Sequence, residues 1–570
     1  MKYLNNIKMK KIHILLILMI FIVSCSVDEI FEAAPLDKYA ETSVWTTDSL
    51  SDTFINEVYN GLPNSFAGMF SPDANTVDWY DHHNNANGQA ITKGNLNPAN
   101  SAGWGVTYNK GGDFVTGNQS GLWGYMYKKI RAVNTVLEKL NSDDQAFMDS
   151  RTGEVLTLRA IFYSRLALAF GKVIIVGDDL LDLDSDYLSM KQSPFLETMD
   201  YINSELDKAI LLLPESQPEK GRITKYAAMA QKAEMLLIAA SPRFNGGSYN
   251  TSLLQEAKAV NEAIVSSGKF SLLPNFADAT KLLNGNTELI LGRYITAKRK
   301  IDRDNFIDHN LAPGGAGGFT TYTPTQSLVD QFEVIDGTTS FIPATWSNNV
   351  RTVTSNIAYS DDDMYSNRDP RFYETIFYQG SKRNETYTID VSEGGQDSRS
   401  CTGCQWWNNG FFGYYVKKFI GTYLNGNWPS PEINDGVTTL HRLAAVYLNH
   451  AEILFQLGDQ GGALNMVNLV RERAGMVLYT SIDMDKIKHE TVVELIGEGK
   501  RFNNLRRWDD IDEYHQTGEW GIKYTSNGDG TYATELIQIS TPAWNDKFYW
   551  IPIPQKEMDK NPGLEQAPGY

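Results

Sequence analysis

Cysteine is scarce in this sequence. The chain of 570 residues contains only Cys25, Cys401 and Cys404. So few cysteines exclude a scaffold that many disulfides hold together in place of a large core. Cys401 and Cys404 form a lone Cys-x-x-Cys. In an oxidising exterior this pattern predicts a small structural disulfide, with a redox pair or half of a zinc site as the alternatives.

Long apolar runs are also scarce. The strongest run extends from Ile12 to Val23 and is interrupted only by His13. It is shorter than the roughly 20 apolar residues that a transmembrane helix needs. Because lysines precede it, residues 1–24 are predicted to be a secretion signal and not a membrane span.

The cysteine that follows this signal is the predicted membrane anchor. Ile22-Val23-Ser24-Cys25 resembles the lipobox of bacterial lipoproteins, in which the signal is removed and the new terminal cysteine is lipidated. Acyl chains hold a protein on a membrane without a transmembrane helix, since each buried methylene contributes about 0.8 kcal/mol. The alternative is ordinary secretion. Acids at 28–29 resemble the surface-export signal of Bacteroidetes lipoproteins and favour the outer face of the outer membrane.

Positive charge is in deficit. The chain has 51 Lys and Arg against 69 Asp and Glu, a formal net charge of −18, and removal of four lysines with the signal lowers it to −22. Such an acidic surface repels phosphate backbones, which excludes nucleic acid as a partner. Hydrophobic residues at 42% are ample for a core and argue against disorder.

Catalytic motifs are missing. The eight histidines form no His-Glu-x-x-His zinc motif, and Gly-Asn-Gln-Ser-Gly at 117–121 has the wrong spacing for a nucleophile elbow. No Walker or dinucleotide loop is present, so no cofactor is predicted. The acidic run 178–186 has oxygens that suit structural calcium but lacks the EF-hand pattern, so we assign no metal site there. A pair of acids for glycoside hydrolysis stays open as an alternative.

Helical periodicity dominates the chain. Apolar residues recur at steps of three and four, which is typical of amphipathic helices. The expected helices come in pairs, which predicts stacking of helical hairpins as in tetratricopeptide arrays. Their ranges are 121–140 with 154–170, 200–213 with 225–240, and 440–457 with 461–473. The fold class is therefore mainly α, with a loop-rich remainder that contains short strands. The loops 64–121, 295–325 and 341–431 carry many aromatic residues and are candidate binding surfaces.

Several blocks match a known family in order along the chain. They include HRLAAVYLNHAEILFQLGD from His441, ALNMVNLVRERAG from Ala463, ELIGEGKRFNNLRRW from Glu494, and YWIPIPQKEMDKNPGLEQAPGY from Tyr549. Upstream, NRDPRFYETIFYQG from Asn367 also fits. The chain thus resembles the SusD/RagB family of Bacteroidetes surface lipoproteins. The resemblance implies about four tetratricopeptide-like helix pairs, a first region at 25–310 and a SusD/RagB region at 311–570.

The resemblance also implies a function. Family members sit on SusC-like TonB-dependent transporters and bind glycans or other nutrients. The expectation is therefore a binding protein, not an enzyme, that delivers an oligosaccharide or polysaccharide to such a transporter. The same fold with a peptide ligand is the first alternative, and a glycoside hydrolase is the second.

The charged block near the C-terminus has a plain structural interpretation. We expect an ion-pair network along one helix, because oppositely charged residues three or four apart are neighbours there. Its members are Glu494, Glu498, Lys500, Arg501, Arg506 and Arg507.

Sugar binding requires flat aromatic faces beside polar side chains, on loops that a scaffold holds in place. Trp79 and Trp104 are the first choices for the stacking platform. The complete set of predicted ligand residues is Asp78, Trp79, Asn84, Trp104, Trp346, Arg368, Trp406 and Trp407. Core packing is the alternative for each tryptophan and a structural ion pair for Arg368. Trp45, Trp123, Trp508 and Trp550 are expected in the core.

Overall fold

The fold is known from a computed structural model of the chain. It describes residues 44–62, 72–81, 90–101, 121–182, 184–295, 311–316, 318, 320, 322–335, 344–347, 350–353, 363–404, 409–420, 436–540, 542 and 544–570. Cys25 lies outside this range. None of the helices described combines the length and apolar character that crossing a membrane requires.

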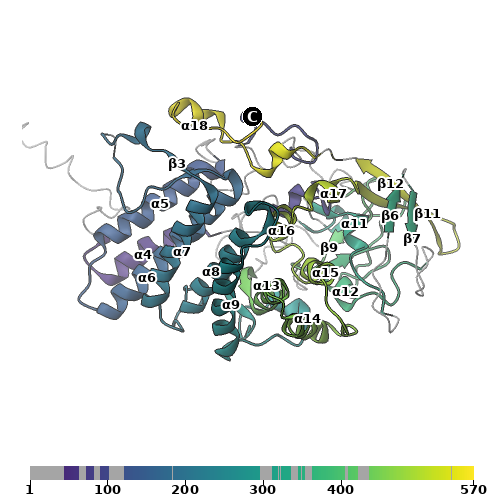
Figure 1. Cartoon of the computed structure of the whole chain (residues 1–570). Helices are drawn as coiled ribbons and strands as arrows, with labels where there is room; N and C mark the ends of the chain where they lie inside the picture. Colours follow the sequence, from purple (N-terminus) through teal and green to yellow (C-terminus); the bar gives the residue numbers. More distant parts are fainter. Residues whose placement is uncertain are drawn as a thin grey trace, which may run out of the picture.

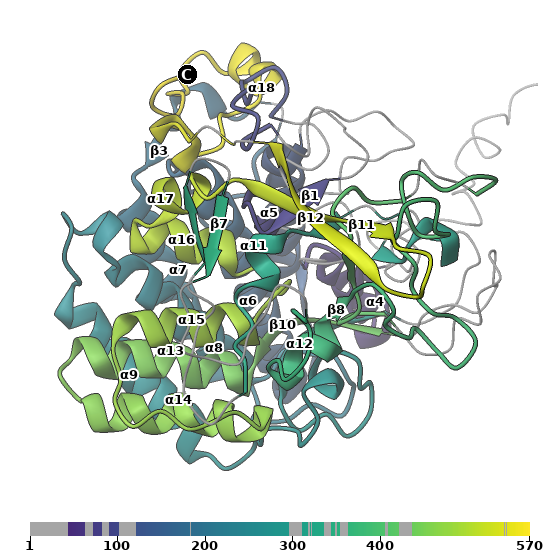
Figure 2. The ribbon, with the colours of Figure 1, turned by 90° about the vertical axis from the view of Figure 1, so that its right-hand side faces the viewer.

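Eight of the described helices form one array of four pairs (Figures 1 and 2). In chain order they are α4 (Asp48–Tyr59), α5 (Gly121–Lys139), α6 (Gln145–Phe170), α7 (Phe195–Leu212), α8 (Lys225–Ala240), α9 (Thr251–Ser266), α13 (Leu443–Gln456) and α14 (Gln460–Ala474). Consecutive helices pack against each other, and α13 packs on α9, so the late pair α13 and α14 continues the array. The prediction of a mainly helical fold with about four helix pairs is confirmed.

Local sequence sets several helix ends. The side chain of Thr224 caps α8 by accepting from the main-chain N–H of Ala227, and α8 has the predicted bounds. α6 begins nine residues earlier than expected, because the carboxylate of Asp144 accepts from the N–H groups of Ala146 and Phe147 and so supplies an N-cap. Shorter helices lie outside the array. α11 (Gln326–Val329) and α12 (Pro370–Thr375) come between α9 and α13 in the chain, and α15 (Met484–Glu494), α16 (Arg501–Trp508), α17 (Ile511–His515) and α18 (Gln555–Lys560) come after α14.

The strands are short and form antiparallel two-stranded ribbons. The pairs are β1 (Trp79–Asp81) with β5 (Tyr322–Pro324), β2 (Val173–Ile174) with β3 (Gln192–Ser193), β4 (Leu289–Ile295) with β10 (Gly436–Arg442), β6 (Ala344–Ser347) with β7 (Val350–Val353), β8 (Ile376–Phe377) with β9 (Tyr415–Val416), and β11 (Glu519–Ser526) with β12 (Tyr532–Ser540). The hairpin of β11 and β12 lies at the opposite end of the molecule from α4 to α7 (Figure 1).

Two large apolar clusters make up most of the core. The first joins the helical array to α16 and to the C-terminal tail around Ile551. The second fills the loop-rich half beneath β1, β5 and the β11–β12 hairpin. Trp123 and Trp508 are buried, and Trp45 and Trp550 are partly buried against the first cluster, as expected. Because the first cluster draws on both halves of the sequence, the division at residue 310 stays a prediction.

Of the predicted charge network, Glu494 and Glu498 do belong to a buried network of ion pairs, but their partners are not the predicted basic residues on one helix. Lys500, Arg501 and Arg507 pair with acids elsewhere. Arg442 is completely buried at the end of β10, and its Nη1 lies 2.6 Å from both Glu288 Oε1 and Glu494 Oε1. Its Nη2 lies 2.8 Å from Glu498 Oε1. The network therefore connects β10 to the end of α15, so its expected geometry of helical neighbours was wrong.

Glu494 shows how strong this network is. Arg371 on α12 and Arg473 on α14 also contact its carboxylate. Burial alone would raise the pKa of Glu494, but attraction to the surrounding arginines outweighs it and holds the pKa well below its usual range.

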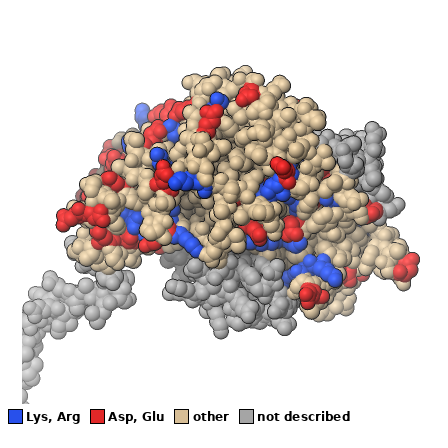
Figure 3. Space-filling model, turned by 90° about the horizontal axis from the view of Figure 1, so that it is seen from below, with Lys and Arg blue, Asp and Glu red and all other residues tan. Residues whose placement is uncertain are grey.

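On the surface, acidic and basic side chains lie among one another on the face in Figure 3, with acidic ones most frequent toward the α4–α7 end.

Candidate functional site

Two predicted ligand residues lie at strand β1: Trp79 is its first residue, and Asp78 directly precedes it. In the ribbon with β5, Trp79 lies opposite Pro324 and Tyr80 opposite Thr323. Because side chains alternate across a strand, Trp79 and Tyr80 point to opposite faces. Trp79 is 3% exposed and belongs to the second core cluster. The expectation that Trp79 presents a free face to a ligand is therefore contradicted.

Asp78 is also buried. Its Oδ2 lies 3.1 Å from Nε of Arg501, and the hydroxyl of Tyr514 donates to its Oδ1. Only 1% of the residue is exposed. The carboxylate therefore ties β1 to α16 and α17 and is not presented to a ligand, contrary to the prediction.

Arg368 is buried and binds main-chain carbonyl groups. Its guanidinium donates to the main-chain carbonyls of Val329 at 2.5 Å, Phe332 at 2.8 Å and Met364 at 2.7 Å. The residue is 1% exposed. Arg368 therefore holds together three turns of the loop-rich half, and its predicted ligand contact is contradicted. The described contacts of its guanidinium are with main-chain carbonyl groups.

The remaining predicted residues have no described side chain. Asn84, Trp104, Trp406 and Trp407 lie outside the described residues, as does the anchor Cys25. Trp346 lies in β6, but only its backbone is described. These positions stay predictions.

The structure does bring two of the predicted regions together. Tyr80, on the face of β1 opposite to Trp79, packs on Phe412 with ring centroids 4.8 Å apart and on Phe411 at 6.2 Å. The guanidinium of Arg399 lies over the Phe411 ring, 4.4 Å from its centroid. Phe411 is 38% exposed. Tyr80 is itself buried, with 9% of it exposed. An exposed aromatic ring beside a cation, formed by Phe411 and Arg399 and backed by Tyr80, therefore lies where the end of β1 meets the segment after Cys404. We call it the Phe411 surface.

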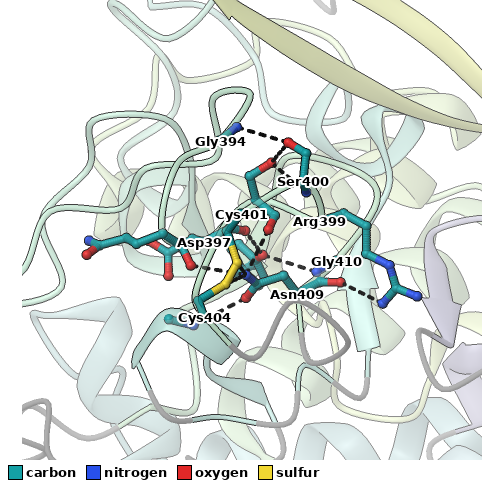
Figure 4. The surroundings of a disulfide bond; sticks show 12 residues. Gly394, Asp397, Arg399, Ser400, Cys401, Cys404, Asn409 and Gly410 are labelled. Carbon is teal, nitrogen blue, oxygen red and sulfur yellow. Dashed lines mark hydrogen bonds between the residues drawn. A yellow bond between two sulfur atoms is a disulfide. The ribbon is translucent and has the colours of Figure 1, made fainter.

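A disulfide and one buried amide hold this surface in place (Figure 4). Cys401 and Cys404 are bonded, as predicted. Nδ2 of Asn409 donates to the carbonyls of Gln396 at 3.0 Å and Ser398 at 2.9 Å, and it lies 3.6 Å from Sγ of Cys401. Asn409 is completely buried, and its own carbonyl accepts from Arg399 Nη1 at 3.3 Å. These contacts fix the described residues on both sides of the disulfide loop, 396–404 and 409–412.

The electrostatics around the Phe411 surface suit binding rather than proton transfer. Partial burial lowers the pKa of Arg399, yet an arginine stays cationic at neutral pH. Burial raises the pKa of nearby Asp397 to about 6, a value that would suit a general acid. However, Asp397 is completely buried and accepts from the Tyr387 hydroxyl at 2.7 Å and from the N–H of Asp390 at 2.9 Å. It cannot reach a ligand at the surface.

The segments that meet at the Phe411 surface were among those predicted from the sequence, but its residues were not. The segment from Cys401 to Tyr415 was predicted for its adjacent tryptophans, whereas the described surface uses Phe411 and Arg399. The Gly-Phe-Phe-Gly run at 410–413 is the signal that was available, but it does not distinguish the exposed Phe411 from Phe412, which is completely buried. Among the described side chains, no cluster of three or more histidine, cysteine, aspartate and glutamate residues could hold a metal ion.

Comparison with known proteins places this architecture. A family model described as the SusD family matches residues 288–570, and a second, described as starch-binding and associating with the outer membrane, matches residues 36–237. A SusD-like protein from Bacteroides ovatus is 23% identical over 539 residues, which cover 90% of this chain and 84% of the relative.

Solved structures of SusD-like proteins superpose on this fold over most of the chain. A SusD-like protein from Bacteroides fragilis superposes with a TM-score of 0.75 at 24% identity, over 94% of this chain and 100% of the other. A SusD-like carbohydrate binding protein from the same species gives a TM-score of 0.72 at 19% identity, over 92% of this chain and 100% of the other. With two SusD models matching successive parts of the sequence, the chain belongs to the SusD family.

Proposed function

We propose that this protein is a glycan-binding lipoprotein on the cell surface, which captures an oligosaccharide or polysaccharide and delivers it to a SusC-like TonB-dependent transporter. The observation that carries the binding step is the Phe411 surface. It offers an exposed ring beside a cation on a loop that a disulfide and Asn409 hold rigid. Aromatic faces stack on the apolar faces of sugar rings, and Arg399 donates to hydroxyls.

The family supports the same function from another direction. One matching model is described as starch-binding and associating with the outer membrane, and a structural relative is a carbohydrate binding protein. The lipobox at Cys25 and the acids after it support attachment at the cell surface. Delivery to a transporter rests on the family resemblance, and binding without cleavage rests on the missing catalytic motifs and the buried position of Asp397.

The binding step is tested with the full lipoprotein purified in detergent. Affinity electrophoresis through gels that contain plant, microbial or host polysaccharides measures retardation, and calorimetry measures binding of a casein digest. Phe411→Ala should weaken binding by about 3- to 10-fold, the range of a lost aromatic contact. Leu211→Ala is the matched control, because Leu211 is 86% exposed on α7 in the helical array.

The outcomes separate the alternatives. Retardation that depends on Phe411 supports glycan binding at this surface. Binding of casein-digest peptides in calorimetry, without retardation by any polysaccharide, would identify the protein as a peptide-binding member of the family. New reducing ends after incubation with a bound polysaccharide would identify it as a hydrolase.

Anchoring and transfer have tests of their own. Metabolic labelling with an alkyne fatty acid should mark the wild type and not Cys25→Ala. Protease added to intact cells should digest the labelled protein. Purification of the tagged lipoprotein from detergent-solubilised outer membranes should recover a TonB-dependent barrel, and its consistent absence contradicts the delivery step.

A further inference from the structure

A hollow opens in the loop-rich half, away from the helical array. It lies between the β11–β12 hairpin and the loop 378–396, with a volume of about 780 Å³. This is within the roughly 300–1,000 Å³ that small-molecule sites occupy. The hairpin that forms one wall stands at the far end of the molecule from α4 to α7 (Figures 1 and 2). We call this hollow the hairpin groove.

Tyrosines form the floor and one wall of the hairpin groove. Tyr532, the first residue of β12, is 39% exposed and meets the ring of Tyr524 edge-on at 6.2 Å. Tyr524 is 4% exposed, and its hydroxyl contacts that of Tyr365. The Tyr365 hydroxyl donates to Tyr414 at 3.0 Å, which donates to the amide oxygen of Gln326 at 2.6 Å. The floor is thus fixed from below, and Tyr532 stands exposed on it.

Polar side chains face the hairpin from the opposite wall, and local hydrogen bonds fix them. Oδ1 of Asp390 accepts from the hydroxyl of Ser392 at 2.6 Å and from Nε2 of Gln379 at 3.2 Å. Nε2 of Gln396 donates to the carbonyl of Thr388 at 2.9 Å. A carboxylate accepts up to about four hydrogen bonds and an amide side chain makes about four. These groups therefore keep capacity for a ligand while their positions are already set.

The charge of the hairpin groove narrows the ligand class. Among the described residues that line it, Asp363 and Asp390 carry charge and neither lysine nor arginine is present. Negative charge disfavours an anionic ligand. Exposed aromatic rings with hydroxyl, amide and carboxylate groups suit an uncharged molecule that has both apolar faces and many hydroxyls.

The same loop supports both surfaces. Gln396 lines the hairpin groove, and its carbonyl accepts from Asn409, the residue that fixes the Phe411 surface. Buried Asp397, next in the chain, accepts from the N–H of Asp390 in the groove wall, and its carbonyl accepts from the Tyr415 hydroxyl beyond the disulfide loop. One frame, residues 390–404 and 409–415, therefore joins the two surfaces.

We propose that the hairpin groove is a second glycan subsite, in which Tyr532 stacks on a sugar ring of an uncharged polysaccharide while Asp390 and Gln396 accept and donate hydrogen bonds to its hydroxyls. This rests on the proposed glycan-binding function and adds a second contact along the same polymer. Two subsites on one frame raise the apparent affinity for a long chain above that for a short oligosaccharide.

The test uses affinity electrophoresis of the full lipoprotein in detergent. The gels contain laminarin, amylopectin, xyloglucan or galactomannan as uncharged polymers, or polygalacturonate as an anionic one. The variants are Tyr532→Ala, Tyr532→Phe, which keeps the ring, and the control Tyr187→Ala. Tyr187 is 48% exposed on a short turn of the helical half. Matching thermal midpoints show that each variant folds.

We expect an uncharged polymer to retard the wild type, Tyr532→Ala to weaken retardation by about 3- to 10-fold, and Tyr532→Phe and Tyr187→Ala to match the wild type. Tyr532→Ala combined with Phe411→Ala should lose more than either change alone. Unchanged binding by Tyr532→Ala overturns the groove and leaves the proposed function standing. Retardation by polygalacturonate alone overturns the ligand class, and no retardation by any polymer overturns both proposals.

Discussion

Glu519 gives the sharpest quantitative prediction, because it is a buried carboxylate at the base of the hairpin that carries Tyr532. The residue opens β11 and is 1% exposed. The hydroxyl of Ser540 donates to its Oε2, and its Oε1 has no hydrogen-bond partner among the described residues. Burial raises its pKa from 4.5 to about 7, against the smaller opposing effects of Ser540 and Lys93.

The perturbation is Glu519→Gln, which removes the charge and keeps the shape. Between pH 4.5 and 7 the folded protein holds a proton that the unfolded chain has released, so wild-type stability falls as pH rises through this window and is level above it. A difference of one in pKa corresponds to about 1.4 kcal/mol. The pKa of about 7 therefore predicts a loss of about 2.5 kcal/mol between about pH 5 and pH 8.

Urea unfolding of wild type and Glu519→Gln at about pH 5 and pH 8 measures this loss. The cost of burying the new amide is the same at both pH values, so it cancels in the comparison, as do contributions from all other titrating groups. The variant should gain about 2.5 kcal/mol on the wild type when the pH is raised. An equal difference at both pH values would refute the raised pKa.

Two further predictions concern stability and the loop frame. Arg442→Ala should lower the free energy of unfolding in urea by about 3–5 kcal/mol, because it leaves buried carboxylates without their partner. The control Lys523→Ala breaks the exposed pair with Glu393 at 3.7 Å and should cost at most about 1 kcal/mol. Similar costs for both variants would contradict a tightly coupled network. Replacing Cys401 and Cys404 by serine opens a small loop and should lower the free energy of unfolding by about 2 kcal/mol. The double serine variant should also be retarded less by polysaccharide, because the disulfide no longer holds the Phe411 surface. Full retardation of this variant would show that Asn409 alone holds the surface.

The sequence by itself determined the helical half. Periodicity and capping are local, so the bounds of α8 and the pairing of neighbouring helices followed from residues within a few turns of one another. Local charge patterning also marked Glu494 and Glu498 as members of an ion-pair network. It could not identify Arg442 as their main partner, because Arg442 lies more than fifty residues away in the chain and only packing brings it near.

The binding surfaces were decided by tertiary structure. A period of two residues says that Trp79 and Tyr80 face opposite ways, but not what covers each face. The second core cluster covers Trp79, and Phe411 and Phe412 cover Tyr80, so both rings are buried. The hairpin groove likewise exists only where β12 meets the loop 378–396. Aromatic and polar residue types can be read from the sequence, whereas exposure depends on contacts between segments far apart in the chain.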